Sequence, residues 1–352
     1  MTSFSPEAPL RVAVLGATGT VGQRFVSLLD GHPWFKLARV CASPRRVGES
    51  YGTSVAWAGA SPCPSAAAEL KLSGTEPSAD IDLVFCALGA DIAGPIEAAW
   101  AAAGALVVSN AASHRMHPEV PLLLPEVNAE HLELARKQSF GPGAILTGPN
   151  CSSAGLVLAL APLQQAFGLR RVSVVTLQAL SGAGLPGVPS MLAIDNIVPY
   201  IAGEEEKLES EPMKLLGTFA DGAITPADFV ISATATRVPV IDGHTEVVSV
   251  ELAGDPSPEA VAEVLRAFRG APDIAALPSA PDMPIVVLDE PDAPQPRRHR
   301  DLQDGMATVI GRIRACPVFG IKFVLLSHNT LRGAAGGAIL IAEAAVARGI
   351  GN

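Results

Sequence analysis

A cysteine at the expected start of a helix is the residue of this chain best suited to nucleophilic chemistry. Cys151 follows the apolar run 143–149, which indicates a strand, and opens the helical pattern 151–167. A helix N-terminus offers free backbone N–H groups and the positive end of the helix dipole, and both stabilise a thiolate. The same N–H groups could hold an oxyanion. The pattern therefore predicts covalent catalysis by Cys151, whereas Cys41 and Cys86 lie in strand patterns and are expected to be buried.

A glycine-rich turn near the N-terminus indicates a nucleotide site. The segment 16–22 reads Gly-Ala-Thr-Gly-Thr-Val-Gly and joins a strand predicted at 11–17 to a helical pattern that reaches about Asp30. Glycines allow a tight turn and a close approach of the backbone to a pyrophosphate, which the helix N-terminus attracts. The spacing is GxxGxxG, slightly off the GxGxxG fingerprint, so its position after the first strand supports the prediction. The expected contacts are Gly16, Thr18, Gly19, Thr20, Val21 and Gly22.

The end of the second predicted strand bears on the choice between NAD and NADP. The strand pattern 35–43 ends in Ser43, and Arg45 and Arg46 follow. NAD sites usually place an acidic residue here for the ribose hydroxyl, whereas the 2′-phosphate of NADP needs cations. Ser43, Arg45 and Arg46 therefore favour NADP. Two arginines in a solvated loop are the alternative interpretation.

Strands and helices alternate through the first 150 residues. Helical patterns near 94–103 and 128–139 separate further strand patterns at 82–88, 105–109 and 143–149. Such alternation predicts an α/β fold with a Rossmann-type, doubly wound parallel sheet.

The pattern changes beyond Cys151. Few helices lie between the later strand patterns, which are 170–181, 246–252, 283–288, 308–316 and 320–327. Long strands of this kind predict a second α+β domain on a mixed or antiparallel sheet. The last helical pattern, about 332–348, is expected to return to the first domain. The expected domains are therefore an NADP-binding domain, 1–150 plus 330–352, and a catalytic domain, 151–329, that begins with the predicted nucleophile.

Composition narrows the class of protein. The chain has 25 basic and 35 acidic residues and a net charge of −10, without a basic stripe, so nucleic acid is not an expected partner. Its five cysteines include no CxxC pair, so neither a metal cluster nor a disulfide framework is predicted. No secretory signal is expected. A membrane span is not expected either, since the apolar stretch 333–350 contains Glu343 and Arg348. These features indicate a cytoplasmic protein with reduced thiols.

Several separate motifs resemble the aspartate-semialdehyde dehydrogenases, in their fungal and archaeal branch. They occur in the same order over most of the chain: GATGTVG (16–22), SNAASHRM (109–116), VPLLLPEVN (120–128), PNCSSAGLVLALAPL (149–163), LQALSGAG (177–184), DNIVPYIAGEEEK (195–207), ESEPMKLLG (209–217), RVPVIDGHTE (237–246) and SHNTLRGAAGGA (327–338). One departure is Gly148, where a polar residue such as Asn is expected.

The resemblance implies a reaction and roles for its residues. NADPH would reduce β-aspartyl phosphate to aspartate semialdehyde through a thioester on Cys151, in the biosynthesis of lysine, methionine and threonine. His244 would be the acid and base, favoured over the other histidines by its place in RVPVIDGH, and Gln178 would orient the substrate. Arg237 would clamp the α-carboxylate, which a guanidinium fits bidentately. The other implied substrate contacts are Glu211 for the α-ammonium, and Lys214, Arg115 and Asn110 for the phosphate.

The resemblance also implies contacts with the cofactor and an oligomeric state. Ser181, Gly182 and Asn329 would contact the cofactor near the nicotinamide, and the chain would form homodimers or homotetramers through the second domain's sheet. Without the resemblance, Glu211 and Lys214 would pass for an ordinary i,i+3 surface pair on a helix.

Other functions fit parts of the pattern. A malonyl- or succinyl-CoA reductase would share the scaffold and the cysteine, but the predicted Arg237, Glu211 and Lys214 favour an amino-acid acyl phosphate. Glyceraldehyde-3-phosphate dehydrogenase and N-acyl-glutamyl-phosphate reductase differ around the cysteine. A non-catalytic protein that senses NADP is disfavoured by the joint presence of Cys151, Gln178 and His244.

Overall fold

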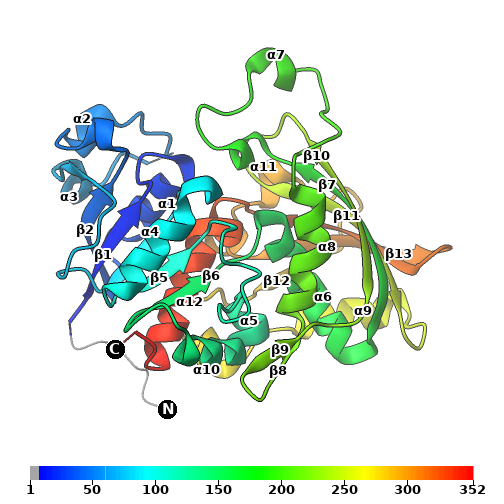
Figure 1. The fold of residues 1–352 in the computed structure, drawn as a ribbon. Helices are drawn as coiled ribbons and strands as arrows, with labels where there is room; N and C mark the ends of the chain where they lie inside the picture. The colour runs from blue at the N-terminus through cyan, green and yellow to red at the C-terminus, as the bar shows by residue number, and fades with distance from the viewer. Residues whose placement is uncertain (1–7, 60, 352) are drawn as a thin grey trace.

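The computed structural model describes residues 8–59 and 61–351, which build two six-stranded sheets side by side (Figure 1). In the first sheet the strand order is β3-β2-β1-β4-β5-β6 and every pairing is parallel. Its strands are β1 (Leu10–Leu15), β2 (Phe35–Cys41), β3 (Leu72–Ser73), β4 (Leu83–Cys86), β5 (Leu106–Ser109) and β6 (Ala144–Thr147). This order is that of dinucleotide-binding sheets and confirms the predicted Rossmann-type fold.

Short helices connect these strands. They are α1 (Thr20–Leu28), α2 (Tyr51–Ser54), α3 (Ser65–Ala68), α4 (Ala90–Ala102) and α5 (Pro125–Asn128), with 3₁₀ turns at 44–46 and 129–137. The helix expected near 128–139 is therefore one α-helical turn followed by a 3₁₀ helix. The central strands β4, β5 and β6 are fully buried, as expected for a parallel sheet covered by helices on both faces.

The second sheet is mixed, with strand order β10-β7-β11-β14-β13-β12. Antiparallel pairs join β7, β11, β14 and β13, while both edge strands pair in parallel. The strands are β7 (Leu169–Gln178), β10 (Val230–Arg237), β11 (His244–Leu252), β12 (Ile285–Leu288), β13 (Thr308–Cys316) and β14 (Gly320–Ser327). This confirms the predicted mixed sheet, although β10 was not among the predicted strands.

The helices of this half include the long α6 (Cys151–Phe167), whose residues 152–163 are all buried. α6 contacts β7, β11 and β14 and also α8 and α9, so it is held between the sheet and its helices. The remaining helices are α7 (Ser190–Ala193), α8 (Glu204–Leu215), α9 (Pro258–Ala267), α10 (Pro272–Ala275) and α11 (Pro296–His299), with 3₁₀ turns at 180–183 and 302–305 and a small hairpin of β8 (Thr218–Ala220) and β9 (Ala223–Thr225).

The chain then returns to the first sheet. A π-helical turn, η5 (Leu331–Ala335), leads into α12 (Gly336–Ala347), which contacts β5 and α1 (Figure 1). Ile339 and Ile341 belong to the same buried cluster as Val12 and Phe85. Within the described part of the chain, no helix is both long and apolar enough to cross a membrane.

Candidate active site

Cys151 is the first residue of α6, as the sequence predicted. The side chain of Asn150 caps this helix, because its Oδ1 accepts a 2.9 Å hydrogen bond from Ser152 N. Cys151 Sγ lies 3.2 Å from Nε2 of His244, the first residue of β11. The two residues are 93 positions apart in the sequence, and the packing of α6 on β11 brings them together.

The hydrogen bonds of His244 determine its tautomer. Ala179 N donates a 3.0 Å hydrogen bond to His244 Nδ1. Since a backbone N–H can only donate, Nδ1 is the unprotonated nitrogen, and the neutral ring carries its proton on Nε2, facing Sγ. Complete burial, with the nearby charge of Arg237, lowers the pKa of His244 to about 3, so the ring is neutral at pH 7.

Three more polar side chains surround this pair. Arg237 Nη1 donates to the Ala179 carbonyl at 2.7 Å and lies 3.5 Å from Gln178 Oε1. Gln178 Nε2 in turn donates to Glu204 Oε2 at 3.1 Å. Arg237 and Gln178 are paired in register at the C-terminal ends of the parallel strands β10 and β7, so their side chains lie close together there. The structure thus groups Cys151, His244, Gln178 and Arg237, which the sequence analysis selected separately.

Glu204 and Lys207 belong to this group and were missed. Glu204 accepts hydrogen bonds from Asn150 Nδ2 at 3.0 Å and from Lys207 Nζ at 2.8 Å, besides the bond from Gln178. Burial alone would raise the pKa of Glu204, but these three donors and the charge of Lys207 lower it below its usual value. Glu204 is therefore an ionised carboxylate beside the nucleophile. Both residues lie in the GEEEK motif at i,i+3 spacing, but Glu211 and Lys214 repeat this spacing seven residues later, so the sequence did not distinguish the two pairs.

These charges act on the thiol. Burial, and then the carboxylate of Glu204, raise the pKa of Cys151 to about 12. The cations Arg115, Arg237 and Lys207 counteract part of this shift. The resting pair is therefore a thiol beside a neutral imidazole, and a ligand that adds or removes charge at Glu204 or Arg237 changes the stability of the thiolate.

Glu211 and Lys214 lie further along α8 and have other partners. Glu211 pairs with Arg115 Nη1 at 2.9 Å and accepts Asn150 N at 2.6 Å. Lys214 Nζ donates to three backbone carbonyls, those of Arg115, His117 and Val120, at 2.7 to 2.8 Å. An ammonium group has three donors. Lys214 therefore holds the loop 115–120 in place, and its burial lowers its pKa to about 8.

Asn110 and Arg115 retain donors that could bind an anion. Arg115 Nη2 donates to the Asn110 carbonyl at 2.6 Å. Among residues 8–59 and 61–351, Asn110 Nδ2 and Arg115 Nε are buried without a hydrogen-bond partner. Asn110 Oδ1 faces Gly148, where a Cβ would lie 3.5 Å from it, so the departure at Gly148 leaves this amide uncrowded.

The glycine-rich turn has the shape that a pyrophosphate needs. Gly16 has φ +76°, and a Cβ there would lie 2.6 Å from the Ala87 carbonyl oxygen. A Cβ at Gly22 would lie 2.2 Å from the Gly16 carbonyl oxygen. Gly19 precedes α1, which begins at Thr20 and continues through Val21, while Thr18 O accepts a hydrogen bond from Gln23. Both outer glycines are therefore required, and the turn leaves the helix N-terminus open to a phosphate.

A cavity of about 280 Å³ lies between the start of α1 and the loop after β7. Thr20 lines it from the first sheet, and Ser181 lines it from the loop after β7. Asn329 holds that loop, since its Nδ2 donates to Ser181 Oγ at 2.8 Å and its Oδ1 accepts Gly243 N at 2.9 Å. A Cβ at Gly182 would lie 2.7 Å from Arg237 Nη1 and 3.2 Å from His244 Cε1, so a larger residue there would displace these catalytic side chains. The cavity has room for part of a dinucleotide between the start of α1 and the loop after β7.

The three residues predicted for the 2′-phosphate lie after β2. Ser43 and Arg45 are exposed. Arg46 is partly buried, donates to Glu49 Oε2 at 3.1 Å and also binds the Ser54 carbonyl. Arg45 is thus the more available cation of the two.

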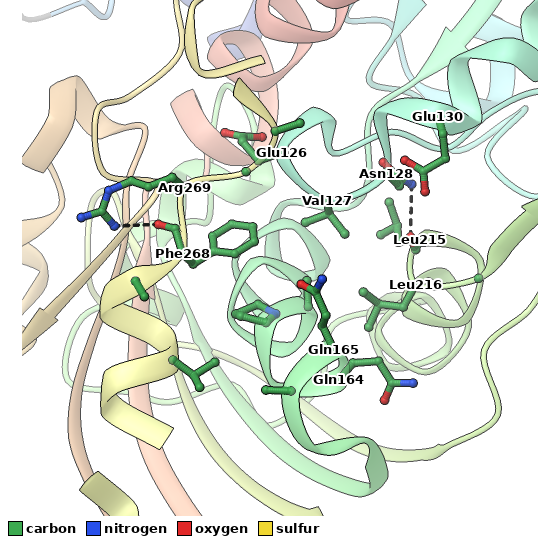
Figure 2. A pocket seen from close by; sticks show the side chains of 18 residues that line it. Glu126, Val127, Asn128, Glu130, Gln164, Gln165, Leu215, Leu216, Phe268 and Arg269 are labelled. Carbon is green, nitrogen blue, oxygen red and sulfur yellow. Dashed lines mark hydrogen bonds between the residues drawn. The ribbon is translucent and has the colours of Figure 1, made fainter. Parts of the chain in front are cut away.

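A cavity of about 690 Å³ lies elsewhere, between α5, the ends of α6 and α9, and the residues after α8 (Figure 2). It contains none of the residues grouped around Cys151.

Comparisons with known proteins agree with this geometry. Residues 11–135 match the family model described as "Semialdehyde dehydrogenase, NAD binding domain", and residues 160–332 match "Semialdehyde dehydrogenase, dimerisation domain". The aspartate-semialdehyde dehydrogenase of Archaeoglobus fulgidus is 49% identical over 94% of this chain and 96% of its own length. That of Cryptococcus neoformans is 47% identical over 99% of this chain and 100% of its own length.

Solved structures are similar over the whole fold. The crystal structure of aspartate-semialdehyde dehydrogenase with NADP from Candida albicans has a TM-score of 0.88 and 42% identity, and covers 97% of this chain and 99% of that one. A second structure, aspartate-semialdehyde dehydrogenase II from Vibrio cholerae, shares the fold with a TM-score of 0.78 at 24% identity.

Proposed function

This chain belongs to the aspartate-semialdehyde dehydrogenase family, and from that membership we propose how its residues perform the reaction. The protein is an oxidoreductase that uses NADP. In the biosynthetic direction it converts β-aspartyl phosphate to aspartate semialdehyde, a reaction of amino-acid biosynthesis. The observation that carries the proposed residue roles is the position of Cys151 Sγ, 3.2 Å from His244 and beside Gln178 and Arg237.

The first half-reaction takes place at the sulfur of Cys151. Sγ forms a bond to the acyl carbon of the substrate, and the bond from that carbon to the phosphate oxygen breaks. The thiol proton leaves with the phosphate, which departs as hydrogen phosphate, so this step needs no separate base. The backbone N–H groups at the start of α6 stabilise the oxygen of the tetrahedral adduct. A thioester on Cys151 results.

His244 acts in this step as a hydrogen-bond donor of fixed tautomer. Its Nε2 carries the proton because Nδ1 accepts the N–H of Ala179. Nε2–H therefore donates first to the sulfur and then to the oxygen of the adduct. The acid and base role implied by the resemblance would require a doubly protonated ring, and the N–H of Ala179 opposes that state because two donors would then face each other.

The second half-reaction releases the aldehyde. Bound NADPH supplies the hydride that reduces the thioester. The hemithioacetal on Cys151 then collapses, the carbon–sulfur bond breaks, and the thiolate regains a proton from water. Ser181 lines the cavity of about 280 Å³, and the adjacent Gly182 lies against Arg237 and His244, so the nicotinamide would lie at this loop.

Substrate recognition follows from the charges around the thiol. Arg237 binds the α-carboxylate, and Gln178 orients the acyl group beside Sγ. Glu204 takes the place of Glu211 as the acceptor of the α-ammonium, because Glu204 contacts Gln178 whereas Glu211 is bound to Arg115 and Asn150.

The phosphate is held by donors on the other side of the site. Arg115 and Asn110 provide the unpaired N–H groups described above, and Lys207 provides a charge that acts on Cys151. Lys214, with its three carbonyl partners, supports the loop that carries Arg115.

We also propose a domain organisation, an oligomeric state and a cellular compartment for this chain. Residues 1–150 and 330–352 form the NADP-binding domain and residues 151–329 the catalytic domain, which the packing of α12 on β5 supports. The chain forms homodimers, or homotetramers built from them, through the outer face of the second sheet, where Val175, Val230 and Val247 are exposed. A nucleophilic thiol must stay reduced, which fits a cytoplasmic protein.

The test is phosphate-dependent reduction of NADP by the purified protein with aspartate semialdehyde. Malonyl-CoA and succinyl-CoA are assayed beside it in the reductive direction. Turnover that needs both the semialdehyde and phosphate is expected. Turnover of a CoA thioester without activity on the semialdehyde would contradict the proposed substrate.

A further inference from the structure

A buried ion pair lies next to the segment that contacts the nucleophile. Arg332, in the π-helical turn η5, places Nη1 2.7 Å from Oε1 of Glu126 in α5. The two side chains are 0% and 1% exposed. Glu126 lies between β5 and β6 of the first sheet, and Arg332 lies where the chain returns from β14 of the second sheet to α12, so the pair ties α5 to this returning segment.

The ion pair is shielded from solvent although Glu126 lines the cavity of about 690 Å³. Figure 2 shows Glu126 at the edge of the large cavity, with its carboxylate directed away from the middle. Gly270 covers it, since a Cβ there would lie 3.0 Å from Glu126 Cβ. In the described part of the chain, neither the carboxylate of Glu126 nor the guanidinium of Arg332 makes a hydrogen bond of good geometry.

Such a pair contributes little to stability. Removing two charges from water costs several kcal/mol for each ion, and the mutual attraction offsets this only when further hydrogen bonds satisfy both groups. Replacement of a buried pair by apolar residues is often neutral or stabilising. A different role should therefore explain why this pair lies here.

The turn that Arg332 anchors is in contact with Cys151. A Cβ at Gly333 would lie 2.8 Å from both Cα and Cβ of Cys151, so the backbones of η5 and α6 touch at this point. η5 continues without a break into α12, where a Cβ at Gly337 would lie 2.5 Å from the Arg332 carbonyl oxygen one turn earlier. η5 is thus a continuous part of the helix that packs on the first sheet, and its backbone contacts the nucleophile directly. A shift of the turn would move Cys151 or open a gap behind it.

We propose that Glu126 and Arg332 are positioning residues: their ion pair fixes η5 against Cys151 and so sets the distance from Sγ to His244. The charge of Arg332 is not among the influences on the pKa of Cys151, which come from Glu204, Arg115, Arg237 and Lys207. The pair therefore acts through position. This inference rests on the proposed role of Cys151 as nucleophile.

The test replaces both partners at once. A Glu126→Leu/Arg332→Met variant leaves no unpaired charge and fills a similar volume, so it should fold. Four quantities are measured: the melting temperature, NADP binding, kcat with KM for aspartate semialdehyde, and the rate of Cys151 alkylation by iodoacetamide as a function of pH, followed by mass spectrometry of the Cys151 peptide. The last readout needs no turnover, so it stays informative even if the proposed substrate is wrong.

The double variant should melt near the wild-type temperature and bind NADP normally. Cys151 alkylation and kcat should fall about tenfold, because small misplacements of reacting groups have effects of this size, while KM changes little. Wild-type alkylation and kcat in the double variant would show that the pair has no positioning role. If that variant does not fold, Arg332→Lys decides in the same way, since it keeps a cation but not the shape of the guanidinium.

Arg348, directly after α12, provides a matched control. Arg348 pairs with Asp273 at 2.7 Å at the surface, with side chains 27% and 52% exposed. Arg348→Met removes an arginine from the same region without touching η5. It should leave the alkylation rate unchanged, and a comparable decrease there would overturn the assignment to Glu126 and Arg332.

Discussion

Gln178 Nε2 donates a 3.1 Å hydrogen bond to Glu204 Oε2, and this contact connects the end of β7 to the first turn of α8. It places an ionised carboxylate within the reach of any substrate that Gln178 orients. Asn150, the cap of α6, donates to the same carboxylate at 3.0 Å. One acidic side chain thus touches the substrate-orienting amide and the residue before the nucleophile.

We predict that Glu204→Gln impairs substrate recognition. Gln cannot provide the charge that an α-ammonium needs, so kcat/KM for aspartate semialdehyde should fall about 100-fold, equivalent to about 2.7 kcal/mol. Steady-state kinetics with NADP held saturating measure this effect. Glu206→Gln, two residues further along α8 and exposed, is the matched control and should behave as wild type.

Glu211→Gln should behave differently from Glu204→Gln. It leaves the buried guanidinium of Arg115 without its partner, which destabilises the fold and disturbs the phosphate side of the site. The melting temperature should fall, and KM for phosphate should rise more than KM for the semialdehyde. If Glu211→Gln instead raised KM for the semialdehyde more than KM for phosphate, and Glu204→Gln did the opposite, Glu211 would be the ammonium acceptor.

We predict that His244 stays neutral with its proton on Nε2 between pH 5 and pH 9. ¹⁵N spectra of imidazole-labelled protein, with the His244 signals identified by their absence in His244→Gln, report the tautomer directly. His244→Gln should also keep more activity than His244→Ala, because an amide can still donate to sulfur. A signal that titrates near the pKa of free histidine would rule out the fixed tautomer.

Arg45 is predicted to determine the preference for NADP. Arg45→Ala should raise KM for NADP about tenfold while KM for NAD changes little, since only NADP carries the 2′-phosphate. Arg46→Ala is a useful comparison: Arg46 also holds the Ser54 carbonyl, so its loss should lower the melting temperature as well. Equal effects of Arg45→Ala on both cofactors would contradict a phosphate contact.

Glu246 should make stability depend on pH. Its side chain is fully buried in β11, and burial raises its pKa well above 4.5. The folded state therefore keeps a proton that the unfolded chain releases above about pH 4.5, so the free energy of unfolding falls as pH rises from that value towards the folded pKa.

Glu246→Gln removes this titration. Its stability relative to wild type should increase by about 1.4 kcal/mol per pH unit within that window, and the gain should vanish near pH 4. Thermal unfolding of both proteins at pH 4, 6 and 8 measures it. A difference between the two proteins that is the same at all three pH values would contradict a buried neutral acid.

Much of the fold could be predicted because apolar runs and turns mark its elements. The bounds of α6, β13 and β14 agree with the predicted 151–167, 308–316 and 320–327. β10 escaped prediction because ISATATR is short of large apolar residues, as befits an edge strand with one exposed face.

The site was less predictable than the fold. Cys151 was identifiable from local sequence, since a strand before it and a helix after it determine its surroundings. Glu204 was not, because α8 carries two acidic and basic pairs seven residues apart, Glu204/Lys207 and Glu211/Lys214. Both lie on the same face of the helix, and only the packing of α8 on α6 and β10 decides which pair reaches the thiol. The tautomer of His244 likewise depends on the backbone of Ala179, which no sequence pattern reports.

The alternation of β11 has a consequence for how this chain can vary. His244, Glu246 and Val248 face inward beneath α6, while Thr245, Val247 and Ser249 face outward. Inserting or deleting a single residue inside this strand would turn the imidazole out to solvent and push Val247 under the thiol. Length changes here are therefore far more harmful than substitutions. A library of β11 variants should therefore retain substitutions at the outward positions more often than insertions or deletions of a single residue.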